Sequence, residues 1–217
     1  MALTDLLDKR PRGFFCRTTR CVALTSMSLI ALVGAVLFSV VDAAPNNALQ
    51  VVEAGVQKRF SDVHHVGPDM FAAKFAGGHG GGVKRTASTS SMQPVLLDIR
   101  RADEFAVSHL PDAIRIDPQA SAETILKTVG DLTGRTVIVY CSVGVRSSQL
   151  AQRVQRTLEA KGATRVVNLE GGIFRWHNEG RGLVRGSLKT DLVHPYDAFW
   201  GRLIDRRDKI AYSPKPD

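Results

Sequence analysis

The sequence predicts an α/β fold in which helices cover both faces of an open, mostly parallel sheet, preceded by an N-terminal apolar export or anchor segment. Two observations support this fold class. Short apolar runs alternate with segments of helical periodicity between residues 95 and 176, which is typical of parallel strands joined by crossover helices. The β-branched run at residues 136–140, bounded by Gly134, has the composition of a central strand buried on both faces.

The composition excludes several classes of protein. The chain has 217 residues, 44% hydrophobic and 23% charged, which fits one domain with appendages and neither a disordered tail nor a multi-span membrane protein. The net charge of +8 is scattered, and no run of six like charges occurs. We therefore expect no nucleic-acid partner.

Residues 22–41 form an uncharged run that is long enough to cross a bilayer, and a basic segment precedes it. Small residues at positions 41 and 43 allow cleavage after Ala43. We interpret residues 1–44 as a signal peptide or, if uncleaved, a membrane anchor through residues 22–41; a buried core helix is the alternative. Both forms place the body in the periplasm or on the outer face of the cytoplasmic membrane.

The body begins with an expected helical extension at residues 45–59, in which Leu49, Val52 and Val56 recur at helical spacing. A domain spans residues 60–182 and contains a Gly-, Ser- and Thr-rich surface loop at residues 77–91. Its expected strands lie at residues 63–66, 95–99, 113–116, 136–140 and 165–169. One helix is expected to begin near Asp69, and four further helices are expected at residues 102–107, 122–129, 147–160 and 172–176.

Residues 183–217 are expected to form a C-terminal extension that packs on the domain as a terminal helix. An apolar face with aromatic side chains supports this interpretation, and a neighbouring basic patch is expected to be solvated. The members of that face are Leu192, Tyr196, Phe199, Trp200 and Leu203. Contact with a membrane or a nucleic acid is the alternative for this mixture of aromatic and basic side chains.

Cys141 is the only cysteine after the apolar run, because Cys16 and Cys21 precede it. An unpaired cysteine in an exported body is either buried and inert or used for chemistry. Cys141 follows the expected central strand and precedes the helix that starts near Ser147. Reactive groups gather at the carboxyl ends of strands in open parallel sheets, so this position favours chemistry.

The loop from Cys141 to Ser147, CSVGVRS, is suited to surround an anion. Backbone N–H groups at a helix start, the helix dipole and Arg146 all favour a thiolate at its centre. Gly144 permits a tight ring, and Ser142 and Ser147 offer hydroxyl donors. A cysteine that only caps a strand is the structural alternative.

Three segments resemble the rhodanese family. The loop at residues 141–147 is similar to the family's Cys-x-x-Gly-x-Arg-Ser active loop, PVLLDIRRADEFAVSHLPDAIRID at residues 94–117 resembles its signature segment, and NLEGGIFRW at residues 168–176 resembles its Gly-Gly and Trp ending. Together they cover about residues 60–182 in the family's order. Asp112 stands where the family usually has glycine, but aspartate also adopts left-handed turns.

The resemblance implies a thiosulfate sulfurtransferase that uses no cofactor beyond a persulfide on Cys141. In the family, the loop cysteine takes sulfane sulfur from a small anionic donor such as thiosulfate and passes it to cyanide or a thiol. The active loop that binds the substrate is then Ser142, Val143, Gly144, Val145, Arg146 and Ser147. We interpret six further residues of the matching segments as structural: Asp98, Glu104, His109, Gly171, Gly172 and Trp176.

Other functions remain as alternatives. A cysteine phosphatase uses the same cradle but places five residues between cysteine and arginine, whereas four residues separate Cys141 from Arg146. A thiol-disulfide oxidoreductase needs a second cysteine nearby, where Val143 and Gly144 stand. A binding or regulatory module without turnover is the third alternative. We interpret His64, His65 and His79 as surface histidines rather than metal ligands, because no cysteine pair or carboxylate accompanies them.

We predict that the body after residue 44 lies outside the cytoplasm. Protease added to spheroplasts of a bacterial host that expresses the full chain is expected to digest the body while a cytoplasmic marker stays intact. Mass spectrometry of the mature N-terminus distinguishes release after Ala43 from anchoring. Full protection of the body, with no cleaved form, would contradict export.

Overall fold

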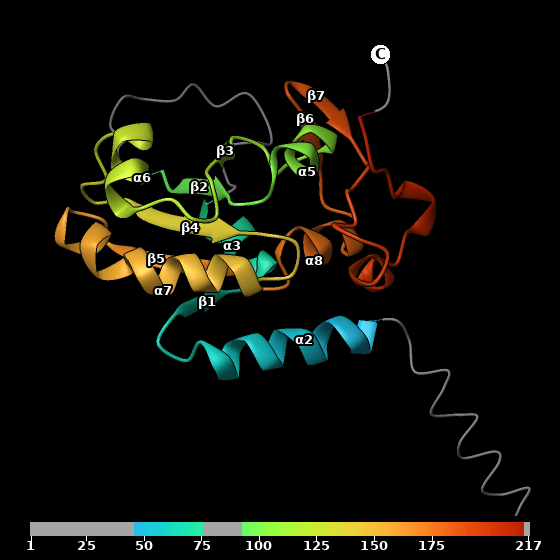
Figure 1. The fold of residues 1–217 in the computed structure, drawn as a ribbon, viewed down its shortest axis with the longest axis horizontal. Coiled ribbons are helices and arrows are strands. Elements are labelled where there is room, and N and C mark those ends of the chain that lie inside the picture. Colours follow the sequence, from blue (N-terminus) through green and yellow to red (C-terminus); the bar gives the residue numbers. More distant parts are fainter. Residues whose placement is uncertain (1–45, 76–92, 215–217) are drawn as a thin grey trace, which may run out of the picture. The chain divides into compact units, whose positions relative to one another are not determined.

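The computed structural model describes residues 46–75 and 93–214, all of which belong to one compact unit, Pro45–Asp217 (Figure 1). The interpreted export or anchor segment at residues 1–44 and the predicted loop at residues 77–91 lie outside the described residues. None of the helices in the described part is long and apolar enough to span a bilayer.

Five parallel strands form the sheet, in the order β1-β5-β4-β2-β3 (Figure 1). The strands are β1 His64–Val66, β2 Val95–Asp98, β3 Ile114–Arg115, β4 Thr136–Tyr140 and β5 Arg165–Leu169. The predicted parallel sheet is confirmed, and β4 occupies its centre as its β-branched sequence indicates. The carboxyl end of β4, where Cys141 follows, is therefore flanked by strands on both sides.

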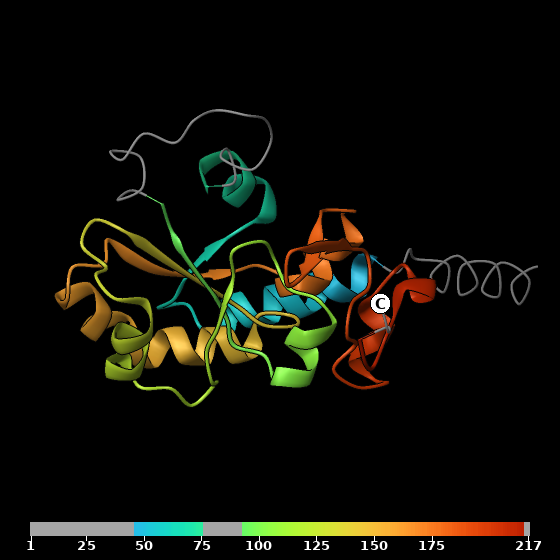
Figure 2. The same ribbon diagram turned by 90° about the horizontal axis from the view of Figure 1, so that it is seen from above.

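Helices cover both faces of this sheet (Figure 2). They are α2 Asn46–Arg59, α3 Pro68–Phe75, α5 Ala102–Val107, α6 Ala122–Val129, α7 Val145–Ala160 and α8 Gly172–Asn178. Val137 and Val139 of β4 pack in one core with α6 and α7, whereas Ile138 and Tyr140 pack in the other with α3 and α8. This alternation follows from the period of two along a strand.

The longest helix in the described part of the chain, α7, is held on the sheet by a stripe of apolar side chains. Leu150, Val154 and Leu158 recur every four residues and are buried. Burial of each stabilises the fold by roughly 1.5–3 kcal/mol relative to exposure. Gly162, just beyond the helix, has a φ of 104°, a left-handed conformation that often ends helices. The stripe fixes the rotation of α7 and thereby the direction in which its first turn points.

The predicted terminal helix is wrong. Residues 183–190 instead form an antiparallel hairpin, β6 Leu183–Arg185 and β7 Leu188–Thr190, and two short 3-10 helices follow, η1 Trp200–Leu203 and η2 Arg207–Lys209. Pro195 cannot donate the hydrogen bond that a helix needs at its position, and Tyr196 has a φ of 68°. The apolar residues of this segment therefore lie on an irregular backbone and do not form one face of a helix.

The C-terminal extension is joined to the domain by backbone pairing and by its apolar residues. His109 and Val184 exchange two backbone hydrogen bonds of 2.8 and 2.9 Å. Of the expected packing face, Leu203 is buried and Tyr196 and Trp200 are half-buried, but Phe199 is 66% exposed. Asp112, which follows His109 in the chain, has a φ of 59°, so it adopts the left-handed conformation that an aspartate tolerates.

The first turn of α8 packs directly on the loop that contains Cys141. The N–H groups of Ile173 and Phe174 donate to the carbonyl oxygens of Cys141 and Ser142 at 2.9 and 3.1 Å. Gly172 has a φ of 53°, and a Cβ added there would lie 2.3 Å from the Cys141 carbonyl oxygen. A glycine is therefore required both by the backbone conformation and by the close approach.

We predict that Gly172→Ala destabilises the fold by about 2–4 kcal/mol, because a left-handed alanine and a steric clash add together. Gly180→Ala is the matched control, since Gly180 has a φ of 70° but nothing lies within 4 Å of the added Cβ. We expect it to cost only about 1–2 kcal/mol. Urea unfolding of both variants measures the difference. Equal destabilisation would show that the approach of α8 to the loop is not tight.

Candidate active site

Cys141 lies immediately after β4, and Ser142, Val143 and Gly144 separate it from the start of α7 at Val145. Its side chain is free of disulfides and only 1% exposed. The N–H of Gly144 donates to its Sγ at 3.2 Å. The first N–H groups of a helix have no intrahelical acceptor, so the start of the 16-residue α7 adds partial positive charge at this point. The thiol is therefore surrounded by groups that favour a negative sulfur.

The back of the loop is attached to β5 through Asn168. Ser147 donates its hydroxyl to Asn168 Oδ1 at 2.6 Å, and both side chains are fully buried. Gly144 has a φ of 101°, and a Cβ there would lie 3.2 Å from Asn168 Nδ2. The sequence interpretation expected the Ser147 hydroxyl to face the anion. In the structure this hydroxyl donates to Asn168 instead, so Ser147 connects the loop to β5.

The expected surface histidines have different environments. His64 is exposed, whereas the His65 ring lies between the Phe60 carbonyl oxygen at 3.2 Å and Asn168 Nδ2 at 3.1 Å. His79 lies outside the described residues. Among the residues that the structure does describe, no group of three or more His, Cys, Asp and Glu side chains could hold a metal ion.

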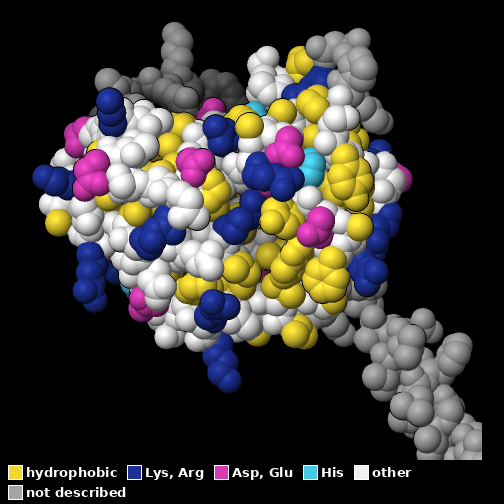
Figure 3. All heavy atoms as spheres, in the orientation of Figure 1, with side chains coloured by type: hydrophobic (Ala, Val, Ile, Leu, Met, Phe, Trp, Pro, Cys, Tyr) yellow, Lys and Arg dark blue, Asp and Glu magenta, His cyan; other side chains and the backbone are white. Residues whose placement is uncertain are grey.

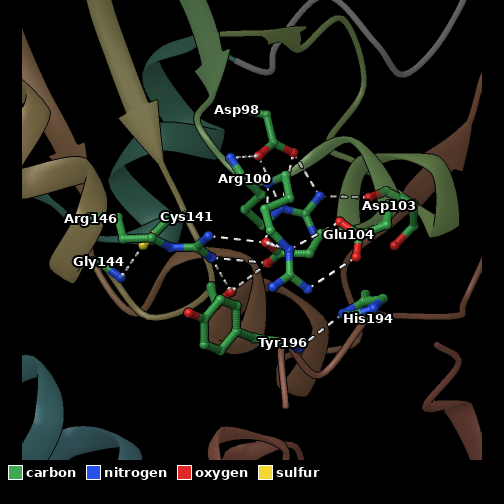
Figure 4. Close-up of polar contacts among 12 residues, drawn as sticks. Asp98, Arg100, Asp103, Glu104, Cys141, Gly144, Arg146, His194 and Tyr196 are labelled. Atoms are coloured by element: carbon green, nitrogen blue, oxygen red, sulfur yellow. Dashed lines mark hydrogen bonds and ion pairs between the residues drawn. The ribbon is translucent and has the colours of Figure 1, made fainter. Parts of the chain in front are cut away.

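Arg146 extends from the loop toward Glu104 of α5, as Figure 4 shows. Its Nη1 and Nη2 donate to the two Glu104 carboxylate oxygens at 3.0 and 2.9 Å. Arg146 Nη2 also donates to Ser142 Oγ at 2.9 Å, and the Ser142 hydroxyl donates to Glu104 Oε1 at 3.1 Å. This two-pronged pairing is the geometry in which arginine and carboxylate interact most strongly.

The pair determines the charge state of both groups. Burial alone raises the pKa of Glu104, but the hydrogen bond and charge of Arg146 outweigh burial and hold the pKa below its ordinary value. Burial lowers the pKa of Arg146, but the hydrogen bond to Glu104 and the negative charges of Cys141 and Glu104 raise it above its ordinary value. The site therefore keeps an ionised carboxylate and an ionised guanidinium at neutral pH.

Glu104 was interpreted as a helix-surface carboxylate, and that interpretation is wrong. Its side chain is fully buried, and its Oε2 also accepts the N–H of Arg101 at 3.1 Å. Glu104 lies in the first turn of a short helix, a position at which a carboxylate is usually exposed. The sequence feature that could have indicated the role of Glu104 is Arg146, because a partly buried guanidinium needs a carboxylate partner.

Asp98 and His109 lie apart from the cysteine loop. Asp98 is fully buried and pairs with Arg100 at 2.6 Å rather than with any residue of the loop. His109 donates from Nδ1 to the Leu110 carbonyl oxygen at 3.0 Å and stacks on Phe105. These contacts agree with the structural roles interpreted for both, although Asp98 lies deeper than a strand end suggests. Trp176 is likewise 6% exposed and packs edge-on against Phe71.

A cavity of about 200 Å³ opens above Cys141. The cysteine loop forms its floor, and two residues of the C-terminal extension form its wall: its lining residues are Cys141, Ser142, Val143, Val145, Arg146, Tyr196 and Trp200. The Tyr196 ring covers the Arg146 guanidinium, with 4.6 Å between ring centre and Cζ. The sequence interpretation assigned Tyr196 and Trp200 to packing and missed this position.

The model of the rhodanese-like domain family matches residues 83–179. A sulfurtransferase of Allochromatium vinosum is 32% identical over 101 residues, which cover 46% of this chain and 86% of that protein. A tRNA uridine(34) hydroxylase of Cupriavidus necator is 33% identical over 88 residues, 39% of this chain. The chain spans only 30% of that hydroxylase.

Among solved structures, the chain is similar to a thiosulfate sulfurtransferase from Pseudomonas aeruginosa. The sequence identity is 20% and the TM-score 0.45, and the match covers 67% of this chain and 24% of that chain.

We predict that the pair of Glu104 and Arg146 stabilises the fold only while the carboxylate is ionised. The folded pKa of Glu104 is lowered below the ordinary 4.5, so its contribution is complete near neutral pH and is lost as pH falls below about 4.5 through the folded value. Glu104→Gln is expected to cost about 2–3 kcal/mol near neutral pH, since it leaves Arg146 without its ion-pair partner.

Urea unfolding of wild type and Glu104→Gln at pH 7 and near pH 3 tests this prediction, and we expect the difference in unfolding free energy to shrink at the lower pH. Asp208→Asn is the control, because the Asp208 side chain is 73% exposed and surface substitutions change stability by about 0.5 kcal/mol or less. A difference for Glu104→Gln that stays constant with pH would contradict the ionised pair.

Proposed function

The chain belongs to the rhodanese-like domain family, and from this premise we propose that it is a sulfurtransferase in which Cys141 carries the sulfur. The observation that carries the proposal is the environment of Cys141 Sγ, which accepts the Gly144 N–H at 3.2 Å and lines a cavity together with Arg146. A sulfur carrier must stabilise first a thiolate and then a persulfide anion, and both need the same donors.

In the first proposed step, the Cys141 thiolate attacks the outer sulfur of thiosulfate. A bond forms between Sγ and that sulfur, the sulfur–sulfur bond of thiosulfate breaks, and sulfite leaves with the electron pair. The outer sulfur of the new persulfide bears the negative charge. The start of α7 and Arg146 support this step because they favour negative charge beside Cys141.

In the second proposed step, an acceptor attacks the outer sulfur of the persulfide. With a thiolate acceptor, a new sulfur–sulfur bond forms on the acceptor, the Sγ–sulfur bond breaks, and its electron pair returns to Cys141 as a thiolate. With cyanide, the same displacement yields thiocyanate. Sulfur is exchanged without net oxidation in both cases, so the cycle requires no cofactor besides the persulfide.

The size of the cavity supports small substrates. Sites for drug-sized ligands usually measure about 300–1,000 Å³, whereas this cavity measures about 200 Å³. Thiosulfate, cyanide and small thiols suit that volume. Hydroxylation of tRNA does not enter the proposal, because the chain spans 30% of the hydroxylase that it resembles.

We also propose that the enzyme works outside the cytoplasm. The basic segment and the uncharged run at residues 22–41 support this location, as argued from the sequence. The donor is then a small sulfur compound outside the cytoplasm, and the acceptor is an exported thiol or a small anion rather than a cytoplasmic carrier.

We predict that Cys141→Ser abolishes sulfur transfer and leaves the fold intact, because serine keeps the size of the side chain but offers no thiolate. Purified wild type exposed to thiosulfate is expected to gain the mass of one sulfur atom, and Cys141→Ser none. Cys16→Ser and Cys21→Ser in the full chain are the matched controls, since both cysteines precede the body. Full thiosulfate-to-cyanide turnover in Cys141→Ser, or a wild type without persulfide, would refute the proposal.

A further inference from the structure

Two aromatic side chains from the C-terminal extension line the cavity above Cys141. Tyr196 and Trp200 lie beyond residues 83–179, the part of the chain that matches the family model. In Figure 3, hydrophobic side chains gather beside Lys and Arg at the right of the described unit, where Figure 1 draws the C-terminal extension. The cavity is thus completed by a segment that the family match does not include.

The backbone of this segment holds both rings in place. Asp197 Oδ1 accepts the N–H groups of Phe199 and Trp200, each at 2.9 Å, and so fixes the start of η1. Tyr196 adopts a left-handed φ of 68°, which is unfavourable for a residue with a bulky side chain. The N–H of Tyr196 donates to His194 Nδ1 at 3.0 Å, which supports this conformation. The strained backbone directs the Tyr196 ring toward the guanidinium of Arg146.

The charge of the cavity is balanced within the protein. Among the described residues that line the cavity, Arg146 is the only one with a charged side chain, and Glu104 pairs with it through hydrogen bonds of 2.9 and 3.0 Å (Figure 4). The Tyr196 ring covers the face of the same guanidinium. Apart from the cysteine and Ser142, the remaining lining side chains are Val143, Val145, Tyr196 and Trp200. The wall opposite the sulfur is therefore apolar and aromatic.

We propose that Tyr196 and Trp200 form an acceptor subsite that selects small thiols carrying an apolar or aromatic group. This inference rests on the proposed function and narrows it to one class of acceptor. An apolar group that enters the cavity leaves water and packs on the rings, with about 25 cal/mol gained for each Å² buried. Cyanide and hydroxyl-bearing thiols offer no such surface. The volume of about 200 Å³ limits the acceptor to a small molecule.

The bound thiol reacts by the displacement given above. Its thiolate attacks the outer sulfur of the Cys141 persulfide, its proton having passed to solvent, and leaves as an organic persulfide while Cys141 returns to the thiolate. The rings of Tyr196 and Trp200 take no part in bond formation. They raise the fraction of time during which the attacking sulfur lies near the persulfide.

The test compares three acceptors on protein loaded with sulfur from thiosulfate: 2-phenylethanethiol, 2-mercaptoethanol and cyanide. We expect the wild type to have the highest kcat/KM with 2-phenylethanethiol. In Trp200→Ala, the ratio of kcat/KM for 2-phenylethanethiol to that for cyanide is expected to fall about tenfold, as one aromatic contact is lost. Trp200→Phe keeps an apolar ring and is expected to restore most of the ratio. Trp200 is chosen because Tyr196 also contacts Arg146.

Leu188→Ala is the matched control, since Leu188 belongs to the same extension, is 56% exposed and does not line the cavity. An unchanged acceptor ratio in both Trp200 variants, or no wild-type preference between the two thiols, would overturn the inference. If the loaded wild type shows sulfur uptake by mass but no such preference, only this inference fails. If the wild type takes up no sulfur, the proposed function itself fails.

Discussion

The cysteine loop is buried, so its carbonyl groups must find donors inside the protein, and this requirement organises much of the fold around it. The first N–H groups of α8 supply those donors, to the carbonyl oxygens of Cys141 and Ser142. The arrangement needs β5 beside β4, so that α8 starts next to Cys141 and Ser142, and a glycine at position 172, where any Cβ would collide with these two residues. The carbonyl oxygens of Cys141 and Ser142 accept hydrogen bonds from α8, and the Gly144 N–H donates to the sulfur of Cys141.

The second organising feature is the buried pair of Glu104 and Arg146. A guanidinium near a sulfur anion favours negative charge there, but an isolated guanidinium in a small cavity would also attract any anion. Glu104 fixes the side chain from below, while Tyr196 covers it from the other side. The positive charge is therefore directed toward Cys141 and shielded elsewhere. The persulfide benefits from that charge, and the approaching acceptor meets aromatic rings instead.

Local signals in the sequence were sufficient for the elements that position Cys141. The β-branched run of β4 and the four-residue repeat of α7 are local; β4 spans its predicted residues, and α7 begins at Val145, slightly before the predicted start at Ser147. Asp112 stands where the rhodanese family usually has glycine; a short aspartate side chain tolerates a left-handed turn, and Asp112 adopts that conformation. Such predictions succeed where a few neighbouring residues determine the geometry.

The remaining features depend on residues far apart in the chain. Glu104 lies 42 residues before Arg146, and only the packing of α5 against the loop reveals that its carboxylate is buried. Pro195 was a visible helix breaker, but the aromatic spacing around it was interpreted as a helix face. A left-handed tyrosine has no sequence signature, so the aromatic wall of the cavity was not predictable.

The topology of the sheet also determines when the thiol becomes shielded during synthesis. The loop of Cys141 is complete only when α8 has been made, and the cavity only when Trp200 follows. At about 5–20 residues per second, the ribosome needs on the order of several seconds to extend the chain from the cysteine to that wall. The edge strand β1 remains unpaired for longer still after its synthesis, because its partner β5 comes about a hundred residues later in the chain. The Cys141 thiol of a nascent chain is therefore uncovered until the segments that bury it have been made.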